Sequence, residues 1–230
     1  MLLLAALLGN AHAGPVAPGE RLEWAVTWMG VQAGTAWSTA ATAAEGLRLE
    51  AGCTSAPWLA SLYPVDDRLV STWRPGAGSA RYVTRFREGD FQQDTDAHLA
   101  GTPIVVARSQ RFDDGWRSWE EQRAAAPGVE DPVSAFYRLR EEAGPVGERV
   151  RFEVWTGRAP AWVQVWTAAA EVVDGAPALR VEVLADHGGG DLESKMTVWL
   201  TDDADRVPIV AEVRTRAGPV RAALTRRVVE

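Results

Sequence analysis

The strongest constraint on this chain is an alternation of apolar and polar residues with a period of two. It occurs in separate runs, which cover residues 22–28, 81–87, 149–155, 180–184 and 196–200. Successive side chains of a β-strand point to opposite faces, so this period predicts strands with one face in a core and the other in water. Most of the chain is therefore expected to form strands.

Turn-forming residues separate these runs. They include Pro75-Gly76, Glu88-Gly89-Asp90, Asp113-Asp114-Gly115, Asp174-Gly175 and Asp202-Asp203. Short strands joined by Gly, Asp and Pro turns are typical of an antiparallel meander. The predicted fold class is mainly β: an antiparallel, strongly curved sheet that forms an open barrel or a sandwich, with one short helix.

One segment has the periodicity of a helix. Apolar residues recur at helical spacing in residues 134–142. Asp131 can cap the first turn, Pro132 suits the first helical position, and the glycine and proline at 144–145 form a stop signal. A shorter segment, residues 57–63, has room for one helical turn before the next proline.

The N-terminus predicts export. An apolar run at 2–8 is followed by a polar break and by Ala11-His12-Ala13, a pattern of small residues that signal peptidases cleave. The run is too short to span a bilayer, which takes about 20 residues. We expect residues 1–13 to be a cleaved signal peptide and 14–230 to be a single mainly β domain. The protein would then be periplasmic or associated with the cell envelope, and not an integral membrane protein.

The charge balance excludes some partners. The chain has 24 Lys and Arg against 31 Asp and Glu, a formal net charge of -7. No basic stripe is available to displace counterions from phosphates, so nucleic acid is not an expected partner. An anionic membrane surface is disfavoured for the same reason.

The single cysteine, Cys53, cannot form an internal disulfide. It is in phase with Leu47, Leu49 and Ala51, which places it on the apolar face of a strand. We interpret it as a buried apolar residue, because free cysteines are among the most buried residues. The alternative is a reactive or intermolecularly paired thiol.

Residues that could perform chemistry are sparse. Beyond the predicted leader only His98 and His187 remain, with no second cysteine, so the usual zinc sites are excluded. There is no phosphate-binding loop and no nucleophile elbow. We therefore predict no catalytic residue, metal or cofactor. A hydrolase acting on envelope glycans is a third hypothesis, which requires two carboxylates roughly 5–10 Å apart in a cleft.

Tryptophan is unusually frequent, with 11 residues against 3 Tyr and 5 Phe. Tryptophans can fill a core, or they can line a wall that binds an apolar, lipid-like or sugar ligand. If they form such a wall, the candidate ligand-binding residues are Trp58, Tyr63, Trp73, Trp162 and Trp166. On the strand that carries Trp162 and Trp166, the other face holds Val163 and Val165.

A charged motif is the second candidate site. Its members are Asp66, Asp67, Arg68, Arg85 and Arg87, with Glu88 beside them. They could form a solvated strand face, with ion pairs worth less than about 1 kcal/mol each. The alternative is an inward-facing pair, since a buried charge needs a partner. We predict such a partly buried pair between Asp67 and Arg85.

Several motifs together resemble a known family. They are GERLEW at 19–24, WMGVQAGT at 28–35, YPVDDR at 63–68, RFREG at 85–89, VEDPVSAFY at 129–137, VWLTDD at 198–203 and RVPI at 206–209. Their order and spacing are similar to those of the exported bacterial family called domain of unknown function 3108. The resemblance implies an envelope location and a mostly β fold, and it implies no activity.

Two functional hypotheses follow. In the first, the curved sheet and the helix at 134–142 hold an apolar or lipid-like molecule between them, by fold-level analogy with open-barrel lipoprotein carriers. In the second, the protein is an interaction or scaffold module that binds other envelope proteins. An internal cavity of a few hundred Å³ would argue against the second hypothesis.

Overall fold

The computed structural model describes residues 16–186, 194–215 and 217–230. Its strands are β1 (Glu20–Trp28), β2 (Val31–Ala43), β3 (Gly46–Ser55), β4 (Asp66–Arg74), β5 (Gly78–Glu88), β6 (Phe91–His98), β7 (Ile104–Phe112), β8 (Gly115–Arg123), β9 (Arg149–Trp155), β10 (Pro160–Val173), β11 (Ala176–Asp186), β12 (Ser194–Thr201), β13 (Pro208–Thr215) and β14 (Gly218–Val229). The described residues also form two helices, α1 (Pro57–Ala60) and α2 (Pro132–Glu142). The alternating runs fall within β1, β5, β9, β11 and β12, which confirms the strand predictions.

All these strands belong to one antiparallel sheet, in the order β8-β7-β6-β5-β4-β3-β2-β1-β14-β13-β12-β11-β10-β9. The chain starts in the middle of the sheet and runs from hairpin to hairpin to the edge at β8. It then crosses through α2 to the other edge at β9 and returns to the middle, where β14 pairs with β1. The sheet is not closed into a barrel, so the predicted open, curved antiparallel sheet is confirmed.

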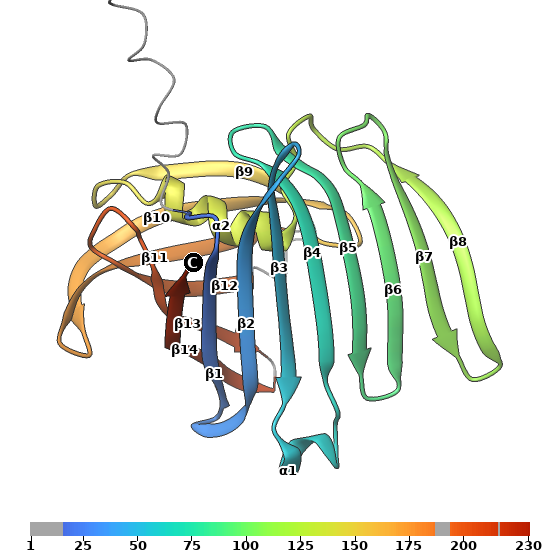
Figure 1. Ribbon diagram of the computed structural model, residues 1–230, viewed down its shortest axis with the longest axis horizontal. Coiled ribbons are helices and arrows are strands. Elements are labelled where there is room, and N and C mark those ends of the chain that lie inside the picture. Colours follow the sequence, from blue (N-terminus) through green and yellow to red (C-terminus); the bar gives the residue numbers. More distant parts are fainter. Residues whose placement is uncertain (1–15, 187–193, 216) are drawn as a thin grey trace, which may run out of the picture.

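The curvature brings the two halves of the sheet to face each other. Figure 1 shows β1 to β8 side by side and β9 to β13 turned across them, with α2 lying between the two halves. The helix contacts β3 and β4 on one side and β9 on the other. It therefore fills part of the space that the curved sheet encloses.

Local signals fix where α2 begins. Asp131 is the N-cap, and its Oδ1 accepts hydrogen bonds from the backbone N–H groups of Val133 at 2.8 Å and Ser134 at 3.0 Å. The Ser134 hydroxyl in turn accepts from the Asp131 backbone N–H at 2.9 Å, which completes a capping box. The predicted helix, its cap and the position of Pro132 are confirmed. The single turn predicted before Pro64 is α1.

The helix α2 contributes side chains to three hydrophobic clusters of the core. Val133 and Tyr137 pack into one cluster with Trp73, Tyr82 and other residues of β3 to β7. Leu139 packs into a second cluster that β9 to β12 supply, and Phe136 touches a third cluster around Leu22 and Trp24 of β1. Because α2 contributes to every cluster, its position is coupled to both halves of the sheet.

The predicted signal peptide lies outside the described residues, so it stays a prediction, as does the boundary at residue 14. Neither helix in the described part of the chain has the length and apolar character that crossing a membrane requires.

Candidate functional site

An apolar cavity of ≈ 500 Å³ lies between α2 and the inner face of the sheet. Ten strands and the helix contribute to its wall. The lining residues are Trp24, Ala36, Trp37, Ser38, Ala51, Gly52, Cys53, Leu69, Pro132, Val133, Ala135, Phe136, Tyr137, Leu139, Phe152, Val154, Val163, Val165, Val183, Met196, Pro208, Val210, Ala211 and Ala222. Among these described residues there is no charged side chain.

Strand alternation explains why the wall is apolar. On β9 and β10 the cavity is lined at every second position, by Phe152 and Val154 and by Val163 and Val165. These side chains share the inner face, since β9 and β10 pair Phe152 with Val163 and Val154 with Ala161. The period of two in the sequence therefore becomes a continuous apolar surface across neighbouring strands.

The hydroxyl groups in the wall satisfy each other. The Tyr137 and Ser38 hydroxyl oxygens are 2.9 Å apart and form a hydrogen bond between α2 and β2. Burial raises the pKa of Tyr137 to about 12, so the phenol is neutral at physiological pH. This bond fixes Tyr137 in place and leaves the surrounding surface apolar.

Cys53 also lines the cavity, which agrees with its predicted position on the apolar face of a strand. Burial, followed by the nearby charge of Asp67, raises the pKa of the Cys53 thiol to about 12. The thiol approaches the Asp67 carboxylate, with Sγ 3.8 Å from Oδ2. A thiol with such a pKa is protonated at neutral pH, so it is a poor nucleophile.

The N-terminal end of α2 is tied to β4 and β5. The buried Asp131 accepts a hydrogen bond from the Ser71 hydroxyl at 2.5 Å, and the Ser134 and Ser79 hydroxyls are 2.7 Å apart. The neighbouring Glu130 forms an ion pair with Arg138 at 3.2 Å. Burial raises the pKa of the Asp131 carboxyl, although the hydrogen bonds from Ser71 and Ser134 oppose that shift.

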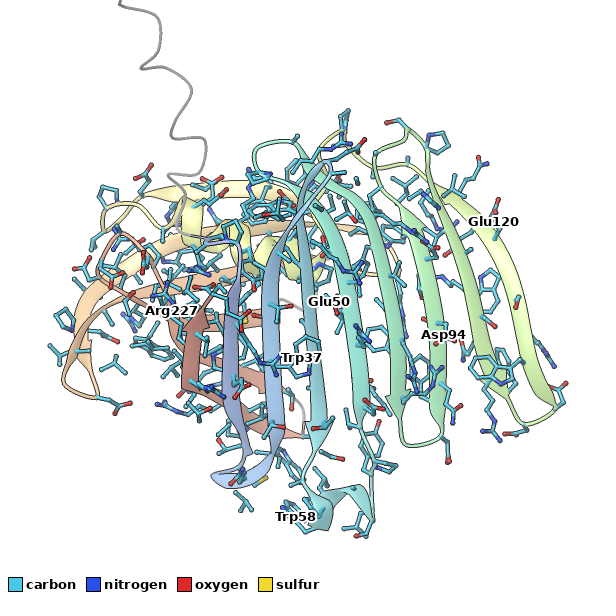
Figure 2. All side chains as sticks on the ribbon, viewed as in Figure 1. Trp37, Glu50, Trp58, Asp94, Glu120 and Arg227 are labelled. Atoms are coloured by element: carbon cyan, nitrogen blue, oxygen red, sulfur yellow. The ribbon has the colours of Figure 1, made fainter. Side chains whose placement is uncertain are left out.

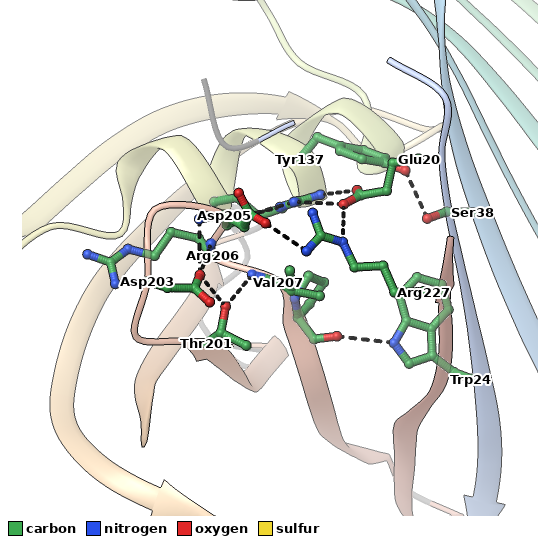
Figure 3. A network of polar contacts seen from close by, with 12 residues as sticks. Glu20, Trp24, Ser38, Tyr137, Thr201, Asp203, Asp205, Arg206, Val207 and Arg227 are labelled. Atoms are coloured by element: carbon green, nitrogen blue, oxygen red, sulfur yellow. Dashed lines mark hydrogen bonds and ion pairs between the residues drawn. The ribbon is translucent and has the colours of Figure 1, made fainter. Parts of the chain in front are cut away.

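The C-terminal end of α2 is tied to β1 and β14 by a buried charge network (Figure 3). Arg140 is 1 % exposed and forms an ion pair with Glu20, which is also 1 % exposed. Arg227 of β14 donates to Glu20 at 3.0 Å and to Asp205 at 2.7 Å, and the Asp205 carbonyl accepts from Arg140 at 2.9 Å. Because both of its ends are bonded to the sheet, α2 forms one wall of the cavity.

The five predicted ligand-binding residues do not line this cavity. Trp73 is fully buried in the core, while Trp58 is 46 % exposed and Tyr63 is 48 % exposed. Trp58 lies at α1, well away from α2, and its indole donates to the Gln32 carbonyl at 2.8 Å (Figure 2). Ligand binding by these three residues elsewhere on the molecule stays a prediction.

Trp162 and Trp166 lie on the outer face of β10. The guanidinium of Arg151 is 4.5 Å from the Trp162 ring centroid, and that of Arg149 is 5.0 Å from the Trp166 ring centroid. The cavity is lined instead by Val163 and Val165, from the other face of the same strand. The aromatic residues that line the cavity include Trp24 of β1 and Phe136 of α2, whose ring centroids are 6.0 Å apart.

The predicted pair between Asp67 and Arg85 is wrong. The sheet register places Arg85 opposite Arg68, so these two share one face and Asp67 points to the other. Asp67 is buried, and it accepts a hydrogen bond from the backbone N–H of Arg87 at 2.9 Å. Arg85 is exposed.

The rest of the charged motif is divided among different partners. Arg68 pairs with Glu50 of β3 at 2.6 Å, and Arg87 pairs with Asp94 of β6 at 2.7 Å. Asp66, at the start of β4, is exposed. Only Asp67 of the five comes close to the cavity, through its contact with Cys53.

Comparison with known proteins gives a family and a fold. The sequence model of a family described as protein of unknown function (DUF3108) matches residues 23–225. No curated protein matches the chain. A solved structure of a beta-barrel-like protein of domain of unknown function DUF1849 from Brucella abortus aligns with a TM-score of 0.62 and 12% identity, over 94% of this chain and 99% of that chain. At that identity, the likeness shows the fold alone.

The lipoprotein LppX from Mycobacterium tuberculosis also aligns, over 90% of this chain and 85% of that chain, with 11% identity. Its TM-score is 0.26, which is too low to support an argument about this chain.

Proposed function

This chain belongs to the DUF3108 family of proteins of unknown function, and we propose that it binds an apolar or lipid-like molecule in the cavity beneath α2. The resemblance predicted from its motifs is thereby confirmed. We also propose, from the apolar run and small residues at 2–13, that the protein is exported and works in the periplasm or at the envelope.

The observation that carries this proposal is the size and chemistry of the cavity. Its ≈ 500 Å³ falls within the range of ligand sites, which is about 300–1,000 Å³. If a methylene takes about the volume of a water molecule in the liquid, roughly 30 Å³, the cavity would hold about seventeen methylenes. That volume suits one long acyl chain or a molecule of similar size.

Energetics also favour an occupant. An empty, fully enclosed core cavity costs about 24 cal/mol per Å³, so ≈ 500 Å³ of apolar space would cost at most on the order of 10 kcal/mol. A whole domain of this kind is stable by only about 5–15 kcal/mol. Water would fill such an uncharged wall poorly, because buried waters need several polar partners. An apolar ligand would supply the van der Waals contacts that the cavity-lining side chains lack. A purely structural role for the protein leaves the cavity unexplained.

The same cavity argues against the scaffold hypothesis, in which the tryptophans fill a solid core. A module that only binds other proteins through its surface has no use for an interior space of this volume.

The experiment is a binding titration with cis-parinaric acid, a fluorescent fatty acid. Ala36→Phe adds a ring on the inner face of β2, where Ala36 lines the cavity. Ala41→Phe makes the same change on the exposed outer face of the same strand and is the matched control. We expect Ala36→Phe to weaken binding at least tenfold and Ala41→Phe to leave it unchanged. Equal binding by all three proteins would show that the cavity is not the site.

A further inference from the structure

A second pocket of ≈ 160 Å³ lies on the inner face of β5, β6 and β7, and its wall mixes the aromatic residues Tyr82, Phe86 and Phe91 with charged and hydroxyl-bearing residues. We call it the polar pocket because the apolar cavity has no charged residue in its wall. The wall of the polar pocket includes Thr84 and Glu88 of β5, Thr95 of β6 and Arg108 of β7. Residues 156–158, which connect β9 to β10, cover it from the opposite half of the sheet. The Arg108 guanidinium donates to the Gly157 carbonyl, which holds this connection over the pocket.

The pocket and the apolar cavity are neighbours. Leu69 lines the cavity and Thr84 lines the pocket, and the two residues are direct partners on β4 and β5. Side chains of such partners lie about 5 Å apart on the same face. The cavity-lining Val154 likewise lies two positions before the pocket-lining segment 156–158. Both connections place the two spaces side by side.

One buried polar group in the pocket has no partner. Thr84 is only 3 % exposed, and no described residue forms a hydrogen bond with its hydroxyl. A buried hydroxyl without a partner destabilises the folded protein, so such groups are rare outside functional sites. Thr84 lines the pocket together with Thr95 and Arg108. Its hydroxyl is therefore a donor without an acceptor in the wall of the pocket.

The pocket also offers positive charge. Arg158 lines its rim, is exposed, and has no ion pair within the described part of the chain. Arg108 is 8 % exposed and pairs with Glu121 at 2.8 Å. Two guanidinium groups and the Thr84 hydroxyl together suit an acidic group with several acceptor oxygens.

We propose that the two spaces form one bipartite site, in which the cavity takes the hydrocarbon chain of an amphiphile and the polar pocket takes its carboxylate or phosphate headgroup. The inference rests on the proposed function, because it assumes that the cavity binds the apolar part. It adds a chemical class: the preferred ligand is an acidic amphiphile, with its headgroup between Thr84 and the two arginines.

The test compares dodecanoate, dodecyl phosphate, neutral dodecanol and inorganic phosphate by calorimetric titration of the full chain. Arg158→Gln removes the unpaired charge at the rim, and Arg214→Gln makes the same change at an exposed position on β13, outside the pocket. We expect the acidic amphiphiles to bind wild-type protein roughly tenfold more tightly than dodecanol. Arg158→Gln should remove most of that preference, and Arg214→Gln should preserve it.

Three results would overturn the inference. If dodecanol binds as tightly as the acidic amphiphiles, and Ala36→Phe weakens all of them, the proposed function stands and the headgroup pocket does not. If inorganic phosphate alone binds as tightly as dodecyl phosphate and Arg158→Gln abolishes both, the pocket is an independent anion site. If none of the amphiphiles binds, the proposed function fails together with the inference.

Discussion

The inner face of the sheet differs between its two halves, although both are built from the same antiparallel strands. Across β9 to β11 the inner positions carry Phe152, Val154, Val163, Val165 and Val183, which line the apolar cavity. Across β5 to β7 the wall of the polar pocket carries Thr84, Gln93, Thr95 and Arg108 among the aromatic residues Tyr82, Phe86 and Phe91. One fold thus supports an apolar wall and a polar wall side by side, and the difference lies entirely in side-chain chemistry.

The helix α2 is anchored to the sheet at both ends. Its N-terminal end is bonded to Ser71 and Ser79 near the polar half, and its C-terminal end is bonded to Glu20 at the centre of the sheet. The bonds at both ends are buried. If the contrast between the halves is functional, then the anchors of α2, the apolar wall and the polar wall should respond differently to substitution.

The largest effect is expected from the anchor at Arg140. Arg140→Met removes the fully buried guanidinium that pairs with Glu20 and leaves the buried carboxylate with Arg227 alone. Breaking a buried ion pair costs about 3–5 kcal/mol when the remaining charge has no partner, so we expect a loss toward the lower end of that range. Urea denaturation should show that loss. The double variant Glu20→Gln/Arg140→Met leaves no uncompensated carboxylate and should recover a large part of it. A loss below about 1 kcal/mol for Arg140→Met would mean that the network does not hold the helix.

The second effect tests the apolar wall. Val165→Thr replaces a methyl group by a hydroxyl in the cavity wall, where Val165 is 2 % exposed. The hydroxyl would be buried among apolar side chains, so we expect a loss of about 1–3 kcal/mol in the free energy of unfolding. Affinity for cis-parinaric acid should fall as well. An unchanged stability would show that water reaches this part of the wall.

The third effect is the reverse exchange in the polar wall. Thr84→Val removes the buried hydroxyl that has no partner among the described residues, and it keeps the side-chain shape. We expect the free energy of unfolding to rise by up to about 1 kcal/mol, because no hydrogen bond is lost. The same variant should lose part of its preference for dodecyl phosphate over dodecanol. A stability loss comparable to that of Val165→Thr would contradict the distinction between the two walls.

How much the sequence predicts depends on how local the signal is. The strands and α2 follow from alternation, a capping residue and a stop signal, all within a few residues of each other. The sequence does not tell whether Trp162 and Trp166 or Val163 and Val165 lie inside, because β10 carries apolar residues on both faces and periodicity alone does not say which face is inside. The inner face is set by neighbours such as Phe152 and Val183, which only the sheet order brings together.

Contacts between residues far apart in the chain could not be predicted from the sequence. The pair between Arg140 and Glu20 joins residues 120 positions apart, so nothing near either residue identifies the other. The wrong pair of Asp67 with Arg85 came from register: a shift of one residue moves a side chain to the opposite face. The lack of a partner for the Thr84 hydroxyl is likewise a property of the assembled sheet.

The smallest effect concerns pH and the acidic residue of the polar pocket. Burial, together with the hydrogen bond and the charge of Asp67 on β4, raises the pKa of Glu88. Tyr63, before β4, and Cys53 of β3 also interact with Glu88, and both are neutral at physiological pH. The cationic Arg108 and Arg158 line the same pocket as Glu88. Because the folded-state pKa is raised, Glu88 favours the folded protein at low pH and loses that contribution as pH rises through its pKa.

The same titration should alter ligand binding. Below its raised pKa Glu88 is neutral and does not repel an acidic headgroup, whereas above that pKa it does. We expect the affinity of wild type for dodecyl phosphate, relative to that of Glu88→Gln, to be lower at pH 8 than at pH 5 by roughly two- to fivefold. Comparing the two proteins at each pH cancels the ionisation of the ligand itself. If their affinity ratio is the same at pH 5 and pH 8, Glu88 does not face the headgroup, and the acidic ligand would then have to bind nearer to Arg158.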